Sequence, residues 1–343
     1  MSRFRGRSDR PEAIDRSDIP GGSQATTLEE PENPLTATDD QDRSEKRQSD
    51  GSMPGSRPDP GPPSPGLQSV QQPGSGLGLV ISVAVAAVVL ALAFYALGGD
   101  VRSGVVPLAQ TTEPFFWAVA AFAVLLSIGG ALYAERTTAR VAEAVGRTRP
   151  ESGLITAWTV PAMATTAAIL LIATYHNGTM LVAGPALAFL GNAGALFSRD
   201  LLDDAEDAAH RTAATIHTLV VLAVAFFALS AIYLNKLPPL TTSLAVGFIG
   251  GLLTLETLER GVGGRDVRIV YAIVTGCLMA QAAVALDWWQ THGWTGGAVL
   301  LVCFYLASGV LLVRVQRTVP RLRDLIELGV VSLVAIVVLA ITA

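Results

Sequence analysis

The stretch SGLITAWTVPAMATTAAILLIATYHNGTMLVAGPALAFLGNAGALFS, residues 152–198, decides the fold class of this chain. Its 47 residues include no Asp, Glu, Lys or Arg. A helix that crosses a bilayer needs about 20 mostly apolar residues, so this stretch is too long for one crossing. His176-Asn177-Gly178 interrupts it near the middle. The stretch therefore predicts two consecutive transmembrane helices.

Similar uncharged stretches recur along the rest of the chain. Backbone donors and acceptors in lipid must be satisfied internally, so each stretch should form a helix. We expect an all-α, polytopic membrane helix bundle that occupies residues 76–343 as one transmembrane helical domain. Its helices, about nine in number, are expected at approximately 77–97, 114–133, 154–175, 179–197, 213–234, 240–257, 268–286, 297–314 and 325–342.

The first 75 residues have a different composition. They hold 11 of the 19 prolines, 13 acidic and 9 basic side chains, and only one aromatic residue, Phe4. Such a segment buries too little apolar surface to offset its chain entropy, so residues 1–75 are predicted to be a disordered, Pro- and charge-rich tail. No charge pattern favours nucleic-acid binding. The partners we expect are the lipid bilayer and other membrane proteins.

The basic residues predict the orientation in the cell membrane. With the tail in the cytoplasm, the inner loops and helix ends hold 13 Lys and Arg residues, whereas the outer loops hold only Arg102 and Lys236. Loops rich in Lys and Arg stay in the cytoplasm. We therefore expect a cytoplasmic N-terminus and, after nine crossings, a C-terminus outside the cell.

The stretch RDLLDDAEDAAHRT, residues 199–212, is the most acidic segment between two apolar runs. At about 100° per residue, one helical arc would carry the carboxylates of Asp200, Asp203, Asp204 and Asp207. Clustered carboxylates are suited to Mg²⁺, which prefers oxygen ligands and often bridges to phosphate. These four residues are therefore the candidate metal ligands of an enzyme.

The spacing resembles that of intramembrane prenyltransferases of the aromatic-acceptor type, which carry an Asn-Asp-x-x-Asp-x-x-x-Asp segment. Asp200, Asp203 and Asp207 fall at its three aspartate positions. The resemblance implies Mg²⁺ as a cofactor, an isoprenoid diphosphate as a substrate and a second acidic segment, with which Glu256–Gly261 can be compared. Arg199 stands where that family has asparagine, and the segment follows the fourth expected helix rather than the second.

A solvated connector explains the same stretch. Arg-Asp pairs recur at 199–200, 265–266 and 323–324, each at the expected inner end of a helix. Acidic groups near a helix start interact favourably with its dipole, and arginines hold the cytoplasmic side. We favour this interpretation, under which the chain has no catalytic or metal-binding residue and no cofactor.

Few polar residues are expected inside the bilayer. His217, Glu256 and Glu259 should lie near the cytoplasmic edge, where their side chains reach water. Asn192 and Gln281 could hydrogen-bond between helices, and the glycines of 191–194 and 247–251 should permit close helix packing. Pro161, Pro185 and Asn192 are the candidates for a solute path, because prolines can kink a helix at a transport site.

Three function classes follow from these observations. A non-enzymatic scaffold or accessory subunit of the cell membrane is the interpretation that we favour, because catalytic motifs and deeply buried charges are missing from the sequence pattern. A transporter of a small neutral or lipophilic solute is the first alternative. A Mg²⁺-dependent intramembrane prenyltransferase that uses residues 200–207 is the second.

Overall fold

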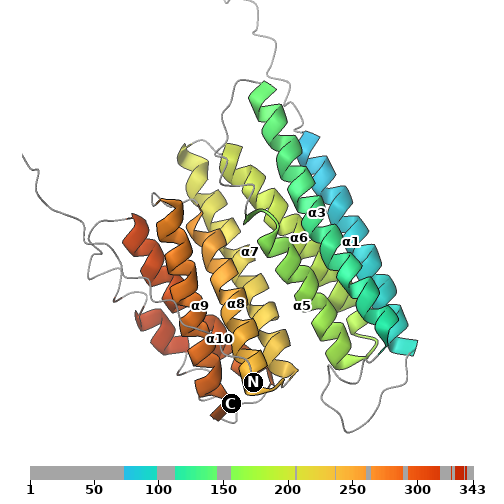
Figure 1. Cartoon of the computed structure of the whole chain (residues 1–343). Coiled ribbons are helices and arrows are strands. Elements are labelled where there is room, and N and C mark those ends of the chain that lie inside the picture. The colour runs from blue at the N-terminus through green and yellow to red at the C-terminus, as the bar shows by residue number, and fades with distance from the viewer. Residues whose placement is uncertain are drawn as a thin grey trace, which may run out of the picture. The chain divides into compact units, whose positions relative to one another are not determined.

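The computed structural model describes residues 73–98, 113–144, 156–204, 207–235, 237–259, 264–288 and 293–316, and, at the end of the chain, 326, 329–335 and 337. The tail predicted for residues 1–75 and the helix predicted at 325–342 therefore lie wholly or mostly outside the described residues. Every regular element in the described part is a helix (Figure 1), which confirms the all-α class.

Eight helices have defined bounds. Seven of them, all but α5, are long and apolar enough to cross a membrane, so the described part of the chain is a helical bundle of the multi-span type. The helices are α1 (Pro73–Gly98), α3 (Pro114–Ala144), α5 (Thr159–Tyr175), α6 (Met180–Asp204), α7 (Asp207–Leu234), α8 (Pro239–Leu258), α9 (Arg265–Trp288) and α10 (Gly293–Gln316).

Helix α5 is the most enclosed element of the bundle. Thirteen of its 17 residues are buried, and α1, α3, α6, α7 and α8 all pack against it. It begins at Thr159, five residues later than expected, and at 1.5 Å per residue it is only about 26 Å long. Because protein rather than lipid surrounds this helix, its length need not match the hydrocarbon thickness.

The break between α5 and α6 lies where the sequence predicts it. His176 adopts a left-handed conformation with φ 36° and donates its backbone N–H to the Ile172 carbonyl at 3.2 Å, which ends α5. Asn177 then accepts a hydrogen bond from the Met180 backbone N–H at 3.2 Å and caps the start of α6. The 47-residue uncharged stretch is therefore two helices.

Contacts between helix ends show that consecutive helices alternate in direction. At one end, which we call the Tyr175 end, the Tyr175 and Trp294 rings stack at 6.2 Å and join the end of α5 to the start of α10. There too, Asn235 beyond α7 donates to the Thr174 hydroxyl at 3.1 Å. At the opposite end, an apolar cluster joins Leu77 near the start of α1 to Leu196 of α6.

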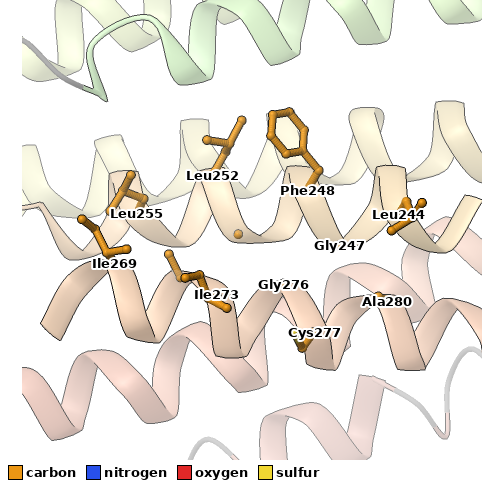
Figure 2. A pocket seen from close by; sticks show the side chains of 12 residues that line it. Leu244, Gly247, Phe248, Leu252, Leu255, Ile269, Ile273, Gly276, Cys277 and Ala280 are labelled. Carbon is orange, nitrogen blue, oxygen red and sulfur yellow. The ribbon is translucent and has the colours of Figure 1, made fainter. Parts of the chain in front are cut away.

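Helices α8 and α9 pack closely against each other and touch through glycines (Figure 2). A Cβ atom on Gly247 would lie 2.7 Å from the Gly276 carbonyl oxygen, and one on Gly276 would lie 2.8 Å from the Gly247 carbonyl oxygen. Such contacts let two backbones approach closely. The expectation that the glycines of 247–251 serve helix packing is confirmed.

Candidate functional site

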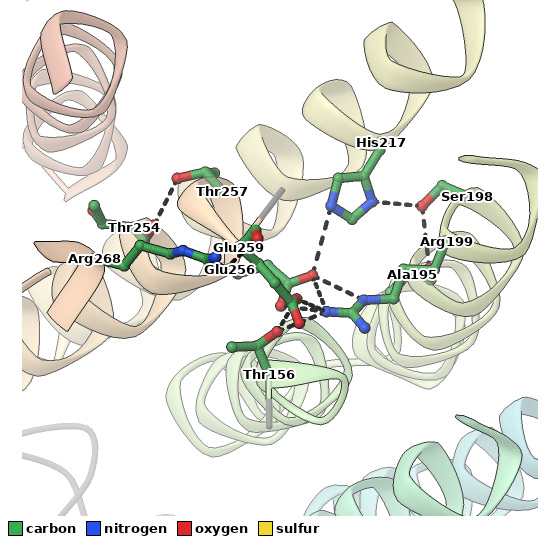
Figure 3. A network of polar contacts seen from close by, with 10 residues as sticks. All are labelled: Thr156, Ala195, Ser198, Arg199, His217, Thr254, Glu256, Thr257, Glu259 and Arg268. Carbon is green, nitrogen blue, oxygen red and sulfur yellow. Dashed lines mark hydrogen bonds and ion pairs between the residues drawn. The ribbon is translucent and has the colours of Figure 1, made fainter. Parts of the chain in front are cut away.

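A buried ionic cluster joins the ends of several helices opposite the Tyr175 end (Figure 3). We call it the Arg199 cluster, and its end of the bundle the Arg199 end. It consists of Thr156 before α5, Ser198 and Arg199 of α6, His217 of α7, and Glu256 and Glu259 at the end of α8.

Arg199 is the centre of this cluster. Its Nε donates to Glu256 Oε1 at 2.9 Å, and its Nη2 lies 2.7 and 2.8 Å from the two oxygens of the same carboxylate. Nη2 also lies 2.6 Å from Glu259 Oε2. One guanidinium therefore holds two carboxylates, and charge-assisted bonds of this kind are roughly twice as strong as neutral ones.

Neighbouring residues extend the cluster to further helices. The Thr156 hydroxyl accepts from Arg199 Nη2 at 2.8 Å and donates to Glu259 Oε2. Arg268 of α9 donates to the Glu259 backbone carbonyl, and the buried carboxylate of Glu135 in α3 adds a favourable charge interaction with Arg199. Four helices, α6, α7, α8 and α9, and the segment before α5 thus meet at this end through polar contacts, and the charge of Glu135 links α3 to them.

His217 bridges α6 and α8. Its Nδ1 lies 2.9 Å from Ser198 Oγ, and its Nε2 lies 3.6 Å from Glu256 Oε1. Serine, histidine and a carboxylate in this order suggest the relay of a hydrolase. However, Ser198 is fully buried, and both oxygens of Glu256 are engaged by Arg199. The geometry favours a structural bridge over a nucleophile that a substrate could reach.

The burial of this cluster corrects the sequence-based expectation. The side chains of His217, Glu256 and Glu259 were expected to reach water, and Arg199 was expected to lie in a solvated connector between two helices. Their exposed fractions are 8%, 3%, 7% and 3%, respectively, so all four side chains lie inside the protein. The expectation was wrong because it treated charges near a helix end as solvated, although opposite charges on neighbouring helices can satisfy one another.

One sequence signal could have indicated this burial. Arg199 lies seven residues after Asn192, so the two share one face of α6. Asn192 is fully buried: its Oδ1 accepts from Ser127 Oγ at 2.7 Å, and its Nδ2 donates to Thr165 Oγ1 at 2.9 Å. The interhelical hydrogen bonds expected for Asn192 are therefore present and join α3, α5 and α6.

The two prolines of the candidate solute path have different positions. Pro161 is the third residue of α5, where the backbone N–H would have no intrahelical partner, so it costs no helix bond. Pro185 lies inside α6 and does remove one such bond. Next to it, Gly184 faces Ile172 of α5, so close that a Cβ would lie 2.7 Å from Cδ1 of that side chain.

The acidic candidates lie at the junction of α6 and α7. Asp200, Asp203 and Asp204 belong to the last turn and a half of α6, and Asp207 is the first residue of α7. Asp200 is half-buried, whereas the side chains of the other three lie outside the described residues. Among the side chains that are described, no three His, Cys, Asp or Glu groups come together as metal ligands. The Mg²⁺ site therefore stays a prediction.

Comparison with known proteins gives one match. Residues 100–342, more than half of the chain, match the family described as "Protein of unknown function (DUF5656)". The matched range includes every residue of the Arg199 cluster, and it excludes the tail and α1. No curated protein and no solved structure matches the chain.

Proposed function

The chain belongs to the family DUF5656, and we propose that it is an integral, multi-pass protein of the cell membrane that acts as a non-enzymatic scaffold or accessory subunit. We propose nine crossings, with the N-terminus in the cytoplasm and the C-terminus outside. The distribution of Lys and Arg supports this orientation, because these residues are concentrated at the Arg199 end and loops rich in them stay in the cytoplasm.

The observation that carries this proposal is that polar contacts fix α5 to its neighbours at both of its ends and in its middle. At the Arg199 end, the cluster connects the segment before α5 to α6 and α8. In the middle, Asn192 connects α5 to α3 and α6. At the Tyr175 end, Asn235 connects α5 to the end of α7. Polar contacts at three depths hold the central helix in one position.

A transporter makes different demands on the same helices. Alternating access requires one end of a bundle to open while the other closes, around a site near the midplane. Here Asn192, the polar candidate for such a site, has both its amide nitrogen and its oxygen engaged by neighbouring residues. This arrangement supports a static framework over a solute path.

Spin–spin distance measurements on the reconstituted protein test this proposal. One pair of labels replaces Asn177 and Thr241, both exposed at the Tyr175 end, and a second pair replaces Glu143 and Asp266, both exposed at the Arg199 end. Cys277 and Cys303 are first changed to alanine, because both are free thiols.

A scaffold gives one narrow distance at each end, and imposing a pH or ion gradient leaves both unchanged. Two distances at each end, with proportions that shift in opposite directions, would overturn the proposal and favour the transporter. The wild-type oligomeric state in the same lipid serves as the control for distances between copies.

A further inference from the structure

An apolar groove runs along the outer side of α8 and α9 (Figure 2). Its volume is about 450 Å³, within the range of about 300–1,000 Å³ that is typical of small-molecule sites. Phe248 and Leu252 of α8 and Ile273 and Cys277 of α9 contribute to its walls. Phe248 is 64% exposed and Ile273 is 60% exposed, so the groove is open at the outer surface of the described helices.

The glycine contacts between the two helices account for the floor of this groove. Gly247, Gly251 and Gly276 have no side chains to fill the seam, and a Cβ on Gly251 would lie 3.0 Å from the Ala272 carbonyl oxygen. The larger residues on either side stand beside this seam. The groove is thus a fixed product of close helix packing, since it does not depend on a side chain moving away.

The length of the groove matches one leaflet of a bilayer. Its lining runs from Leu244 to Leu255 on α8 and from Ile269 to Ala280 on α9. Eleven residue steps at 1.5 Å per residue give about 17 Å along each helix. Half of a hydrocarbon core is about 15 Å thick. The groove begins beside the Arg199 end, where α8 ends and α9 starts, and stops partway along both helices.

The mouth of the groove at the Arg199 end is basic. Arg265 lies four residues before Ile269, so the two share one face of α9. Arg268 donates to the Glu259 carbonyl, which holds its guanidinium between the end of α8 and the start of α9. Asp266 carries the opposing charge in the first turn of α9, so Arg265 and Arg268 outnumber the acidic side chains there. Guanidinium donors therefore adjoin an apolar channel.

From this combination we infer that the α8–α9 groove binds one anionic phospholipid of the leaflet at the Arg199 end. An acyl chain lies in the groove between Phe248 and Ile273. The phosphate lies beside Arg265 and Arg268, which supply the planar donors that suit phosphate oxygens. The apolar groove thus binds the acyl chain, and the two arginines bind the phosphate of the same lipid.

A partner helix fits the groove less well than a lipid. A transmembrane helix with its side chains is about 10–12 Å wide and crosses the full 30 Å of hydrocarbon. The groove covers only about half of that depth. A second copy of this chain would present such a helix, so its docking here is an outcome that the experiment must distinguish.

Native mass spectrometry of the full chain, purified from vesicles of equal parts phosphatidylglycerol and phosphatidylcholine, tests the inference. Cys277→Trp fills the groove, and its matched control is Leu278→Trp, on the neighbouring exposed residue of α9 that does not line the groove. Arg265→Gln removes a charge at the mouth. Its matched control is Arg314→Gln, an exposed arginine in the last turn of α10 at the same end of the bundle.

We expect wild-type protein to retain phosphatidylglycerol in preference to phosphatidylcholine. Cys277→Trp should lose the retained lipid, and Arg265→Gln should lose the preference, while both controls behave as wild type. Equal retention of the two lipids, or the same loss in Leu278→Trp as in Cys277→Trp, would overturn the inference. So would a dimer that Cys277→Trp dissociates, because the occupant would then be a second copy. If Cys277→Trp does not fold, the exposed Arg265 substitution still decides the result.

Discussion

The guanidinium of Arg199 lies 2.7 Å from Glu256 Oε1 and 2.6 Å from Glu259 Oε2, although these residues are 57 and 60 positions apart in the chain. Removing one partner of a buried ion pair leaves an uncompensated charge, at a cost of about 3–5 kcal/mol. We predict that Arg199→Ala and Glu256→Ala each lower the free energy of unfolding in detergent by this amount. Glu143→Ala, at an exposed position of α3, should have little effect.

Arg199→Lys separates geometry from charge in the same cluster. Lysine keeps the positive charge but cannot reproduce the planar contact with both oxygens of Glu256. We predict a loss of stability between that of Arg199→Ala and that of the wild type, measured in the same unfolding experiment. A lysine variant as stable as the wild type would show that charge alone holds the cluster.

Asn192 links three helices through its amide, so Asn192→Ala should weaken the middle of the bundle. Hydrogen bonds between membrane helices contribute about 0.6 kcal/mol each on average, and up to about 2 kcal/mol. We therefore predict a loss of about 1–2 kcal/mol. Thr218→Ala is the control, because this exposed hydroxyl donates to the Ala214 carbonyl of its own helix. Equal effects of the two substitutions would contradict the bracing role of Asn192.

The seam between α8 and α9 should not tolerate a side chain. Gly276→Ala would place a Cβ atom 2.8 Å from the Gly247 carbonyl oxygen, so the two helices must separate. Overpacking of this kind costs about 1–3 kcal/mol. Gly129→Ala in α3 is the matched control, because a Cβ there meets nothing within 4 Å. A thermal unfolding midpoint that falls for Gly276→Ala but not for Gly129→Ala is the expected result.

The acidic stretch can be tested directly for the enzymatic alternative. We predict that alanine at Asp200, Asp203 and Asp207 together leaves the protein folded, as judged by its elution and its unfolding midpoint. We also predict that the wild type and the triple variant give the same titration calorimetry result with Mg²⁺ and farnesyl diphosphate. Binding by the wild type that disappears in the variant would favour the prenyltransferase.

Sequence alone predicted the eight described helices well, because long uncharged stretches favour helices, which satisfy their backbone groups internally. It underestimated the helices that continue beyond their apolar stretches. Helix α3 runs to Ala144 rather than to residue 133, and α7 begins at Asp207 rather than at residue 213. A rule based on apolar length stops at the first charged residue, whereas backbone hydrogen bonding continues through amphipathic turns.

The candidate site was harder to predict from the sequence. Local patterns do not show which helix ends meet, so the partners of Arg199 on α8 could not be named from the stretch around it. The resemblance to prenyltransferases named the carboxylates at 200–207 and, as a second acidic segment, Glu256–Gly261, but it did not indicate that Glu256 and Glu259 bind Arg199. Only the shared face of Asn192 and Arg199 indicated that this arginine turns inward.

Labelling of single cysteines in intact cells tests the central claim most directly. Asn177→Cys lies in the exposed turn between α5 and α6 at the Tyr175 end, and Glu143→Cys lies near the exposed end of α3 at the Arg199 end. In a background without Cys277 and Cys303, a membrane-impermeant maleimide should label Asn177→Cys in intact cells, and Glu143→Cys only after permeabilisation. Labelling of both residues in intact cells, or of Glu143→Cys alone, would contradict a membrane-spanning bundle whose Arg199 end faces the cytoplasm.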